Sequence, residues 1–365
     1  MKIKDIIKYL EQVAPPALQE SYDNAGLLTG SADWNCTGVL CTLDSTEAIV
    51  DEARSRGCNL IVAHHPILFK GIKRLNGNNY VERTILKAIK NDIAIYAIHT
   101  NLDNVSHGVN GRIADKLGLI NRSVLAPMTG RLRKLYTYVP LAHTNKVRDA
   151  LFAVGAGVIG QYSECSFEVP GTGTFKAGGN TNPFVGKQGE RHLEPENKLE
   201  LVFPDWLQGA VLQALFASHP YEEVAYDIVE LAQPYPQIGA GMMGELENPM
   251  PEADFLAFVA NVFGIPAIRH TAFTGQPIKK VAICGGAGSS LIFNALNTGA
   301  QAYLTADIKY HEFFEADGRL VLCDIGHFES EQYTISLLSD ILQQKFPTFA
   351  VLKSELNTNP VHYYF

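Results

Sequence analysis

The feature that most constrains the fold is the alternation of short apolar runs with segments of helical periodicity. Apolar runs of strand length occur at residues 39–43, 60–63 and 93–98, and again towards the C-terminus at 280–284, 302–305, 320–325 and 349–352. Segments in which apolar residues recur every three or four positions follow most of these runs. Strands that alternate with helices predict an α/β fold, with a mostly parallel sheet core flanked by helices.

Two helices of this core bear on the functional argument. Asp44, with Glu47 three residues further on, resembles a capping box at the start of a helix that ends at Gly57. Towards the C-terminus, a long helix is expected to begin near His327 and to continue through Leu342. Each helix starts where a predicted strand has just ended.

The middle of the chain has a different order of elements. Strand-like runs at 135–139, 165–169, 199–203 and 224–231 are separated by helical segments at 145–154 and 205–217 and by a stretch rich in Gly, Pro and Asn at 171–189. This is the β-α-β-β-α-β order of a ferredoxin-like domain. Segments rich in proline and glycine border it. We therefore predict a discontinuous core of residues 1–127 and 238–365, with an inserted ferredoxin-like α+β domain at residues 128–237.

Composition argues against several classes of protein. The formal net charge of −8 disfavours a broad nucleic-acid-binding face. We recognise no signal peptide and no apolar run of transmembrane length. The six cysteines form no CxxC pair and three lie in apolar runs, so we predict reduced cysteines rather than a disulfide framework or a thiolate zinc site. These features predict a cytoplasmic protein without membrane contact.

Two adjacent histidines directly follow the second predicted strand. His64 and His65, followed by Pro66, leave an extended backbone in different directions. Such a pair chelates one ion poorly and suits two ions that lie side by side. A pair of surface histidines at a strand end is the alternative interpretation.

Three further groups of metal-ligand type follow other strands. Asp103 comes just after the third strand, where a helix N-cap or loop aspartate is the commoner explanation for a lone residue. His327 and Glu331 are four residues apart on a predicted helix, which places both on one face, whereas Glu329 should point elsewhere. A solvated acidic helix start is the alternative for this pair.

The shared position of these groups favours metal binding. Each follows the carboxyl end of a predicted parallel strand, and open α/β sheets gather ligand sites along that edge. Five nitrogen and oxygen ligands exceed what one structural zinc needs and fit a centre of two divalent ions with a bridging carboxylate. We therefore predict a metal site made by His64, His65, Asp103, His327 and Glu331. These ligand types suit zinc, iron or manganese and do not decide among them.

Four other features near predicted strand ends have open interpretations. Asp307 and His311 form a second pair spaced by four residues, which either orients ligands or substrate or serves the structure. His99 is open in the same way. Gly285-Gly286-Ala287-Gly288 is interpreted as a tight turn rather than a phosphate cradle, because it matches neither nucleotide-binding fingerprint. The segment His219-Pro220-Tyr221-Glu222-Glu223, in the insert, is assigned no chemistry.

Six short motifs make the chain similar to a known family. They keep the family's order and span nearly the whole chain: Tyr22-Asp23-Asn24-Ala25-Gly26-Leu27, Leu43-Asp44-Ser45-Thr46-Glu47, His64-His65-Pro66-Ile67-Leu68-Phe69, Thr100-Asn101-Leu102-Asp103, Thr305-Ala306-Asp307 with His311, and Gly326-His327-Phe328-Glu329-Ser330-Glu331. On these motifs the chain resembles the dinuclear-metal-centre hexameric family, also called GTP cyclohydrolase I type 2 homologues or NGG-one-interacting-factor-three-like proteins. Tyr22 replaces a usual Trp and Ala306 a usual Gly, and neither position is a predicted ligand.

The resemblance implies properties that spacing alone does not. It implies two metal ions on the five predicted ligands, a ring-shaped homohexamer, and an insert similar to signal-transduction and copper-tolerance proteins. It also implies a metal-dependent hydrolase that acts on a nucleotide such as GTP. For that reaction we expect Asp307 or His311 to be the catalytic proton carrier, because a histidine titrates near neutrality and the pKa of a carboxylate can be raised. The alternative is a non-enzymatic metal-binding protein with a regulatory or metal-handling role.

Overall fold

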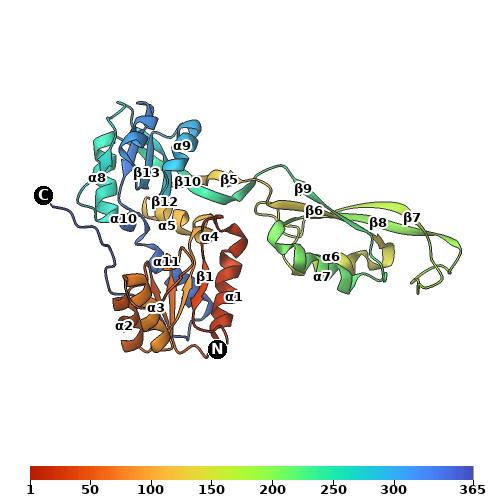
Figure 1. Ribbon diagram of the computed structural model, residues 1–365. Helices are drawn as coiled ribbons and strands as arrows, with labels where there is room; N and C mark the ends of the chain where they lie inside the picture. The colour runs from red at the N-terminus through yellow and green to blue at the C-terminus, as the bar shows by residue number, and fades with distance from the viewer. Residues whose placement is uncertain (365) are drawn as a thin grey trace. The chain divides into compact units, whose positions relative to one another are not determined.

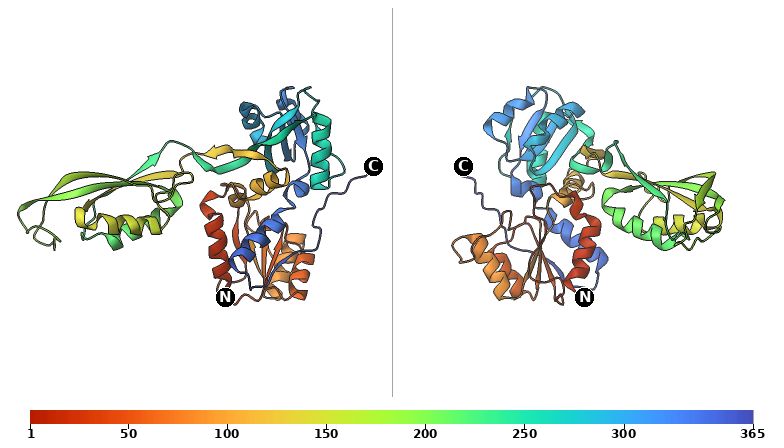
Figure 2. Two further views of the ribbon diagram at one scale, coloured as in Figure 1. Left: turned by 180° about the vertical axis from the view of Figure 1, so that it is seen from behind. Right: turned by 45° about the vertical axis from the view of Figure 1, so that its right-hand side comes forward.

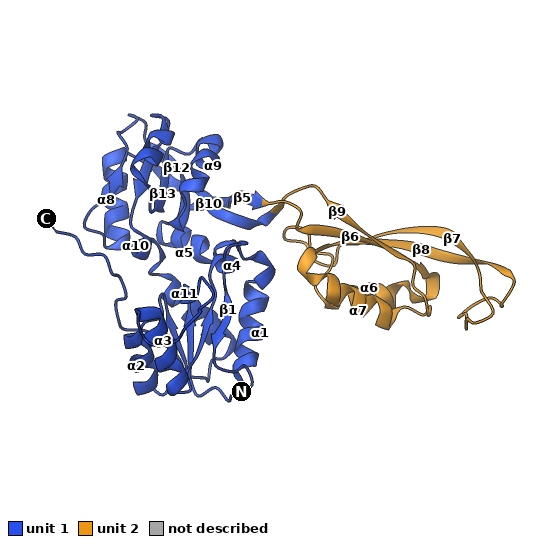
Figure 3. Cartoon of the chain, viewed as in Figure 1, with its two compact units in different colours: residues 1–127, 236–365 blue, residues 128–235 orange. Residues whose placement is uncertain are grey.

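A computed structural model of the 365-residue chain describes residues 1–364 (Figure 1). The chain forms a mixed α/β structure with three sheets of three or more strands among these residues. It divides into two compact units, which are coloured separately in Figure 3. Unit 1 contains residues 1–127 and 236–365, and unit 2 contains residues 128–235.

The first sheet of unit 1 has five short strands in the order β1-β4-β3-β2-β15. Their bounds are β1 (Gly26–Thr29), β2 (Val39–Thr42), β3 (Leu60–Ala63), β4 (Ala94–Ala97) and β15 (Val351–Lys353). Strands β15, β2, β3 and β4 pair in parallel, and β1 joins β4 antiparallel. Every residue of β2, β3 and β4 is buried, as expected for parallel strands covered on both faces.

Four helices cover the two faces of this sheet. Helices α2 (Glu47–Ser55) and α3 (Tyr80–Lys90) lie on one face, and α1 (Ile3–Val13) and α11 (Thr334–Lys345) lie on the other (Figure 2). Alternate strand residues such as Leu40, Ile61 and Ile95 pack with the apolar sides of α2 and α3, because side chains alternate between the faces of a strand. This packing fixes the carboxyl ends of β2, β3 and β4 beside one another.

The second sheet of unit 1 has the order β11-β14-β13-β12-β10-β5. Its strands are β5 (Ile120–Met128), β10 (Tyr235–Met250), β11 (Arg269–His270), β12 (Ile278–Ala287), β13 (Ala302–Ala306) and β14 (Val321–Asp324). Strands β12, β13 and β14 are parallel, whereas β10 and β11 pair antiparallel with their neighbours. Helices α8 (Glu252–Phe263) and α9 (Ile292–Thr298) also belong to this part of the unit, and α9 packs in its apolar core.

Unit 1 differs from the prediction in having two sheets rather than one. Local patterns indicate that strands and helices alternate, but they do not specify which strands become neighbours. Of the predicted C-terminal strands, only β15 joins the first sheet. Strands β5 and β10 overlap the segments rich in proline and glycine at 126–130 and 234–241, which the sequence predicts to be domain borders.

Short elements complete the region where the two sheets of unit 1 meet. They are α4 (Thr100–Asp103), α5 (Val109–Lys116) and α10 (His327–Glu331). The predicted long C-terminal helix is therefore two helices, because α10 ends at Glu331 and α11 begins at Thr334. Five 3₁₀ segments are also present among residues 1–364: Pro16–Leu18, Leu141–His143, Asp205–Leu207, Ser289–Leu291 and Tyr310–Ala316.

Unit 2 is an antiparallel sheet with two helices on one face. Its strands are β6 (Leu132–Pro140), β7 (Phe167–Lys176), β8 (Arg191–Pro204) and β9 (Tyr226–Leu231), in the order β7-β8-β6-β9. Helices α6 (Thr144–Ala153) and α7 (Gln208–Ser218) bury Val147, Leu151, Val211 and Leu215 in its apolar core. Strand β7 extends into the glycine-rich stretch, which an edge strand tolerates. No helix among residues 1–364 is long and apolar enough to cross a membrane.

Candidate metal centre

The two adjacent histidines lie directly after β3 and direct one ring nitrogen each towards the same space. Nδ1 of His64 donates a hydrogen bond to the carbonyl oxygen of Ile98 at 2.9 Å, and Nδ1 of His65 donates to Asp44 Oδ1 at 2.8 Å. Their Nε2 atoms are thereby left to face the other candidate ligands. A histidine that binds a metal through one ring nitrogen typically donates a hydrogen bond from the other nitrogen, which fixes the orientation of the ring.

Helix α10 supplies the other half of the cluster from the end of β14. His327 Nε2 lies 3.1 Å from Glu331 Oε2, as the spacing of four residues on one helix face predicts. Nδ1 of His327 donates to Asp307 Oδ2 at 2.8 Å. Glu329 points away and accepts a hydrogen bond from Asn359 Nδ2 at 2.9 Å, which agrees with the expectation for this residue.

Glu331 joins two groups of candidate ligands. Its Oε2 atom is 2.9 Å from His65 Nε2 and 3.1 Å from His327 Nε2, and its Oε1 atom is 3.7 Å from His64 Nε2. Asp103 Oδ1 lies 3.6 Å from His64 Nε2. In each group, the ligand atoms lie within 4.8 Å of one another: His65, His327 and Glu331 in one, and His64, Asp103 and Glu331 in the other. One carboxylate shared by two groups of three is an arrangement that fits a pair of ions.

Two atoms of this cluster have no hydrogen-bond partner among residues 1–364. His64 Nε2 and Asp103 Oδ1 are both buried and both face the shared space. Leaving such a polar atom without a partner costs about 1–3 kcal/mol, so native proteins rarely do so without a reason. A divalent cation would satisfy both atoms, and the nitrogen and oxygen donor set matches metals such as zinc, iron and manganese.

The charges around Glu331 shift the pKa values of the histidines. Burial lowers the pKa of His65, but hydrogen bonds with Asp44 and Glu331 outweigh it and raise the value to about 10. Burial also lowers the pKa of His327, but hydrogen bonds with Glu331 and Asp307 outweigh it and raise the pKa to about 9. Burial lowers the pKa of His64, so this ring is neutral at pH 7 and has a free electron pair on Nε2.

The pKa values of the two carboxylates, Asp103 and Glu331, shift in opposite directions. Burial and the neighbouring charge of Glu331 raise the pKa of Asp103 well above its ordinary value. Burial also disfavours ionisation of Glu331, but hydrogen bonds from His327 and His65, together with the nearby ring of His64, lower its pKa well below the ordinary value. Without metal, His65 and His327 therefore favour the protonated form at pH 7, and metal binding must displace these protons.

A fourth histidine, His99, borders the cluster. Its ring packs against those of His64 and His65, and the three offer ligand atoms within 4.8 Å of one another. Nδ1 of His99 donates to Asp23 Oδ1 at 2.8 Å, and Asp23 also accepts hydrogen bonds from the backbone N–H and the hydroxyl of Thr100. Burial would raise the pKa of Asp23, but these bonds lower it to about 2.

Asp307 and His311 occupy different surroundings. Asp307 contacts the cluster through His327 and has a backbone φ of 57°, so the pair does not lie on one face of a helix. His311 is exposed, and its ring contacts Tyr310 and Phe314. Among residues 1–364 no hydrogen bond or ion pair joins His311 to the five predicted ligands. A catalytic role for either residue stays a prediction.

The glycine turn after β12 packs directly against Glu331. Gly286 has a φ of 63°, and a β-carbon at this position would lie 2.4 Å from Glu331 Oε1. Its backbone N–H donates to Ser330 Oγ at 2.9 Å. A tight turn is therefore the role that these contacts support, and only glycine allows the approach.

Sequence reasoning missed two carboxylates that position histidines. The capping-box interpretation of Asp44 is wrong: Thr46 caps α2 by accepting from the Ile49 N–H, and Asp44 accepts from His65 instead. Asp44 follows the carboxyl end of β2, and that position was the available signal. Asp23, which orients His99, lies 76 residues away in a segment without periodicity, so local pattern gave no indication of its partner.

Fold and cluster together define the class, an α/β protein with a buried group of histidines and carboxylates that can hold metal ions. The profile described as Duf34/NIF3 (NGG1p interacting factor 3) matches residues 1–360. The chain therefore belongs to the Duf34/NIF3 family, and this confirms the resemblance drawn from its motifs.

Relatives in this family match the chain over nearly its full length. A Halalkalibacterium halodurans protein named GTP cyclohydrolase 1 type 2 homolog is 40% identical over 361 residues, which cover 97% of each chain. A Bacillus subtilis (strain 168) protein of the same name is 39% identical over 363 residues, 98% of this chain and 97% of the relative. The crystal structure of a Bacillus cereus protein related to NIF3 has a TM-score of 0.87 at 35% identity, and covers 100% of this chain and 99% of that one.

Proposed function

We propose that this protein binds two divalent metal ions and uses them to hydrolyse a nucleotide. The observation that carries the proposal is Glu331, whose two carboxylate oxygens each face a separate pair of ligand atoms. In this proposal His65 and His327 hold one ion, His64 and Asp103 hold the other, and Glu331 binds both. The name of the curated relatives, GTP cyclohydrolase 1 type 2 homolog, makes GTP the first substrate to test.

Bound divalent ions would supply Lewis acidity, which activates water and stabilises negative charge that develops on a substrate. The chain's own groups orient the ligands. Asp44, Asp307 and the Ile98 carbonyl each hold a histidine Nδ1–H, so that the three Nε2 atoms face the ions. Asp307 is more than half exposed and next to His327, which makes it a candidate to carry a proton between the site and solvent. His311 is the second candidate.

Turnover of nucleotides by metal-loaded protein tests this function. Wild type, Glu331→Gln and His311→Ala would be loaded with zinc, iron or manganese and incubated with GTP and related nucleotides, and products would be followed by mass spectrometry. We expect ring opening or hydrolysis by wild type and none by Glu331→Gln. Equal turnover by wild type and His311→Ala would remove His311 from the mechanism.

The second candidate function is a non-enzymatic regulatory or metal-handling role. Burial of the ligands favours it, because His64 is fully buried and Glu331 is 3% exposed, so a bound ion would be shielded from large substrates. If loaded wild type yields no product above a blank of metal alone across the panel, the hydrolase proposal fails and this role replaces it.

We also propose that residues 128–237 form a ferredoxin-like insert and that the chain assembles as a homohexamer. The strand order β7-β8-β6-β9, with α6 and α7 on one face, supports the first proposal. Family membership is the basis of the second, and closed symmetric rings are common among homo-oligomers. Light scattering of the purified protein should report about six chains, and a clean monomer at micromolar concentration would refute the hexamer.

A cytoplasmic location is proposed as well, since the six cysteines are free.

A further inference from the structure

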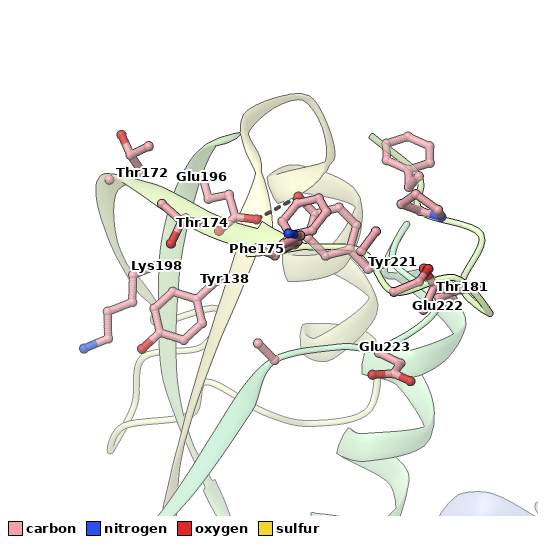
Figure 4. A pocket seen from close by; sticks show the side chains of 18 of the residues that line it. Tyr138, Thr172, Thr174, Phe175, Thr181, Glu196, Lys198, Tyr221, Glu222 and Glu223 are labelled. Atoms are coloured by element: carbon pink, nitrogen blue, oxygen red, sulfur yellow. Dashed lines mark hydrogen bonds between the residues drawn. The ribbon is translucent and has the colours of Figure 1, made fainter. Parts of the chain in front are cut away.

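Unit 2 contains a hollow that is unrelated to the metal centre. Its volume is about 670 Å³, within the range of about 300–1,000 Å³ typical of small-molecule sites. Strands β7 and β8 form one side, and Tyr221, Glu222 and Glu223, from the segment at 219–223, form another (Figure 4). None of these residues belongs to the metal centre.

Aromatic rings cluster around one part of the hollow. The ring centroid of Tyr221 lies 6.2 Å from that of Phe175 and 6.3 Å from that of Phe184. Tyr138, on β6, lines the hollow as well. The faces of aromatic rings carry negative potential, so such clusters attract cations that also present apolar surface.

A buried carboxylate lies in the same place. Glu196 is 8% exposed and accepts a hydrogen bond from the Tyr221 hydroxyl at 2.7 Å, drawn as the dashed line in Figure 4. That bond uses Oε1, and no hydrogen bond to Oε2 is found among residues 1–364. Oε2 lies over Gly173, where a β-carbon would be only 2.1 Å away, so the carboxylate occupies space that the glycine leaves free.

The charge of Glu196 is not balanced by a neighbouring cation. Within residues 1–364, no lysine, arginine or histidine lies within ion-pair distance of it. Lys198 lines the hollow, but its ammonium group lies 4.3 Å from the ring centroid of Tyr136 and extends away from Glu196 in Figure 4. Lys176 is exposed, and Glu222 and Glu223 add two further carboxylates to the lining.

His219 forms hydrogen bonds with the backbone of Tyr138 and Tyr221 and adds no charge to the hollow. Its Nε2–H donates to the carbonyl oxygen of Tyr138 at 3.0 Å, and its Nδ1 accepts from the backbone N–H of Tyr221 at 3.1 Å. Burial lowers the pKa of His219, so the ring is neutral at pH 7. Burial and the adjacent Glu196 raise the pKa of Tyr221, which therefore remains a donor.

From these contacts we infer that the hollow in unit 2 is a binding site for a small organic cation, such as an amidinium, guanidinium or ammonium compound. The N–H groups of the cation donate to Glu196 Oε2, and its apolar body lies against Phe175, Phe184 and Tyr221. A carboxylate with one free oxygen and no cationic partner favours cations over neutral and anionic ligands, because a cation forms a charge-assisted hydrogen bond with it.

Binding of benzamidine and benzamide to the full-length protein tests this site. The two probes have the same ring, but only benzamidine is a cation, so the comparison needs no variant. Isothermal titration calorimetry should show benzamidine binding to wild type and benzamide binding at least about tenfold more weakly, as a charge-assisted hydrogen bond predicts. Equal affinity for the two probes, or no benzamidine binding at millimolar concentration, would overturn the inference.

Two variants and a control locate the binding. Glu196→Gln should weaken benzamidine binding at least about tenfold and leave benzamide binding unchanged. Phe184→Ala should weaken it severalfold through the lost ring, and this side chain is 52% exposed, so its removal leaves the fold intact. Glu190→Gln is the matched control, since this exposed glutamate does not line the hollow. Unchanged binding in Phe184→Ala, or in a folded Glu196→Gln protein, would refute the site.

Discussion

His65 Nε2 lies 2.9 Å from Glu331 Oε2, although 266 residues separate the two in the chain. His65 follows β3 of the first sheet, and Glu331 ends the short helix that follows β14 of the second sheet. The carboxyl ends of two separate sheets of unit 1 therefore face one another at the cluster. Both ligand groups that contain Glu331 also contain residues from the first sheet, so the site for two ions depends on both sheets having folded and packed together.

Removal of Glu331 is expected to have the largest effect on metal content, because this residue belongs to both ligand groups. Wild type should carry up to two divalent ions per chain, His64→Ala should lose one of them, and Glu331→Gln should lose most of both. Elemental analysis of the purified proteins measures this directly. His311→Ala is the matched control, and full metal content in both His64→Ala and Glu331→Gln would rule out the site.

Metal binding should release protons at neutral pH. His65 and His327 have pKa values of about 10 and about 9 in the metal-free protein, so both rings favour the protonated form at pH 7. Their Nε2 atoms are 3.3 Å apart, and an ion must displace whatever proton each carries. Calorimetry in two buffers of different ionisation enthalpy should report at least about one proton released per chain, and affinity should fall as the pH is lowered. A release of zero protons would contradict these protonation states.

The carboxylates of Asp44 and Asp307, which accept hydrogen bonds from His65 and His327, should increase metal affinity without binding metal themselves. Asp44 and Asp307 each accept an Nδ1–H at 2.8 Å, so Asp44→Asn and Asp307→Asn should lower metal affinity by about 10–100-fold while the fold remains. Competition with a chromophoric chelator measures the affinities. Asp317→Asn, an exposed aspartate outside these contacts, is the control. Affinities equal to wild type would show that these carboxylates do not orient the rings.

The parts of the site that could be predicted are those encoded by local pattern. Strand ends located His64 and His65, and helical spacing placed His327 and Glu331 on one face. The role of Asp44 could not be predicted, because the same residues also match a capping box, and only the position of His65 decides between them. The pairing of Asp23 with His99 depends on tertiary contacts that no local pattern contains.

The same limit explains the errors in the fold. Alternating strands and helices predicted an α/β core, but neighbours in a sheet are set by packing over long sequence distances. Strands β5 and β10 were missed because proline and glycine within them are also typical of loops. In unit 2, the predicted strand at 165–169 is shorter than β7, because Gly171 and Gly173 are typical of loops. An edge strand such as β7 tolerates these glycines.

Replacement of the insert tests whether unit 1 folds independently. Strands β5 and β10 are neighbours in one sheet, and the insert connects the end of the first to the start of the second. A short flexible linker in place of residues 129–234 should therefore leave a folded protein with unchanged metal content, since closing this connection costs little entropy. Circular dichroism and elemental analysis check the result. An insoluble or metal-free chain would show that unit 1 needs the insert.

The last prediction concerns acid stability and the buried carboxylate of Asp23. Its pKa of about 2 is below the ordinary value of 3.8, because hydrogen bonds with His99 and Thr100 favour the charged form. A lowered pKa stabilises the folded state fully above pH 3.8, and that stabilisation is lost as the pH falls through about 2. The difference of nearly two units corresponds to about 2 kcal/mol at pH 7.

Asp23→Asn should therefore lower the free energy of unfolding by about 2 kcal/mol at pH 7, and the gap to wild type should close between about pH 4 and pH 2. Urea denaturation of chelator-treated protein at pH 7, 4 and 2.5 measures the gap, so that lost metal does not contribute. Acid also protonates other carboxylates in both proteins, so the difference reports the ionisation of Asp23 together with that of the groups it contacts, such as His99 and Asp103. Asp115→Asn, at a residue whose side chain is 60% exposed, should differ little from wild type at every pH. A gap for Asp23→Asn that stays constant with pH would mean that its ionisation contributes nothing to stability.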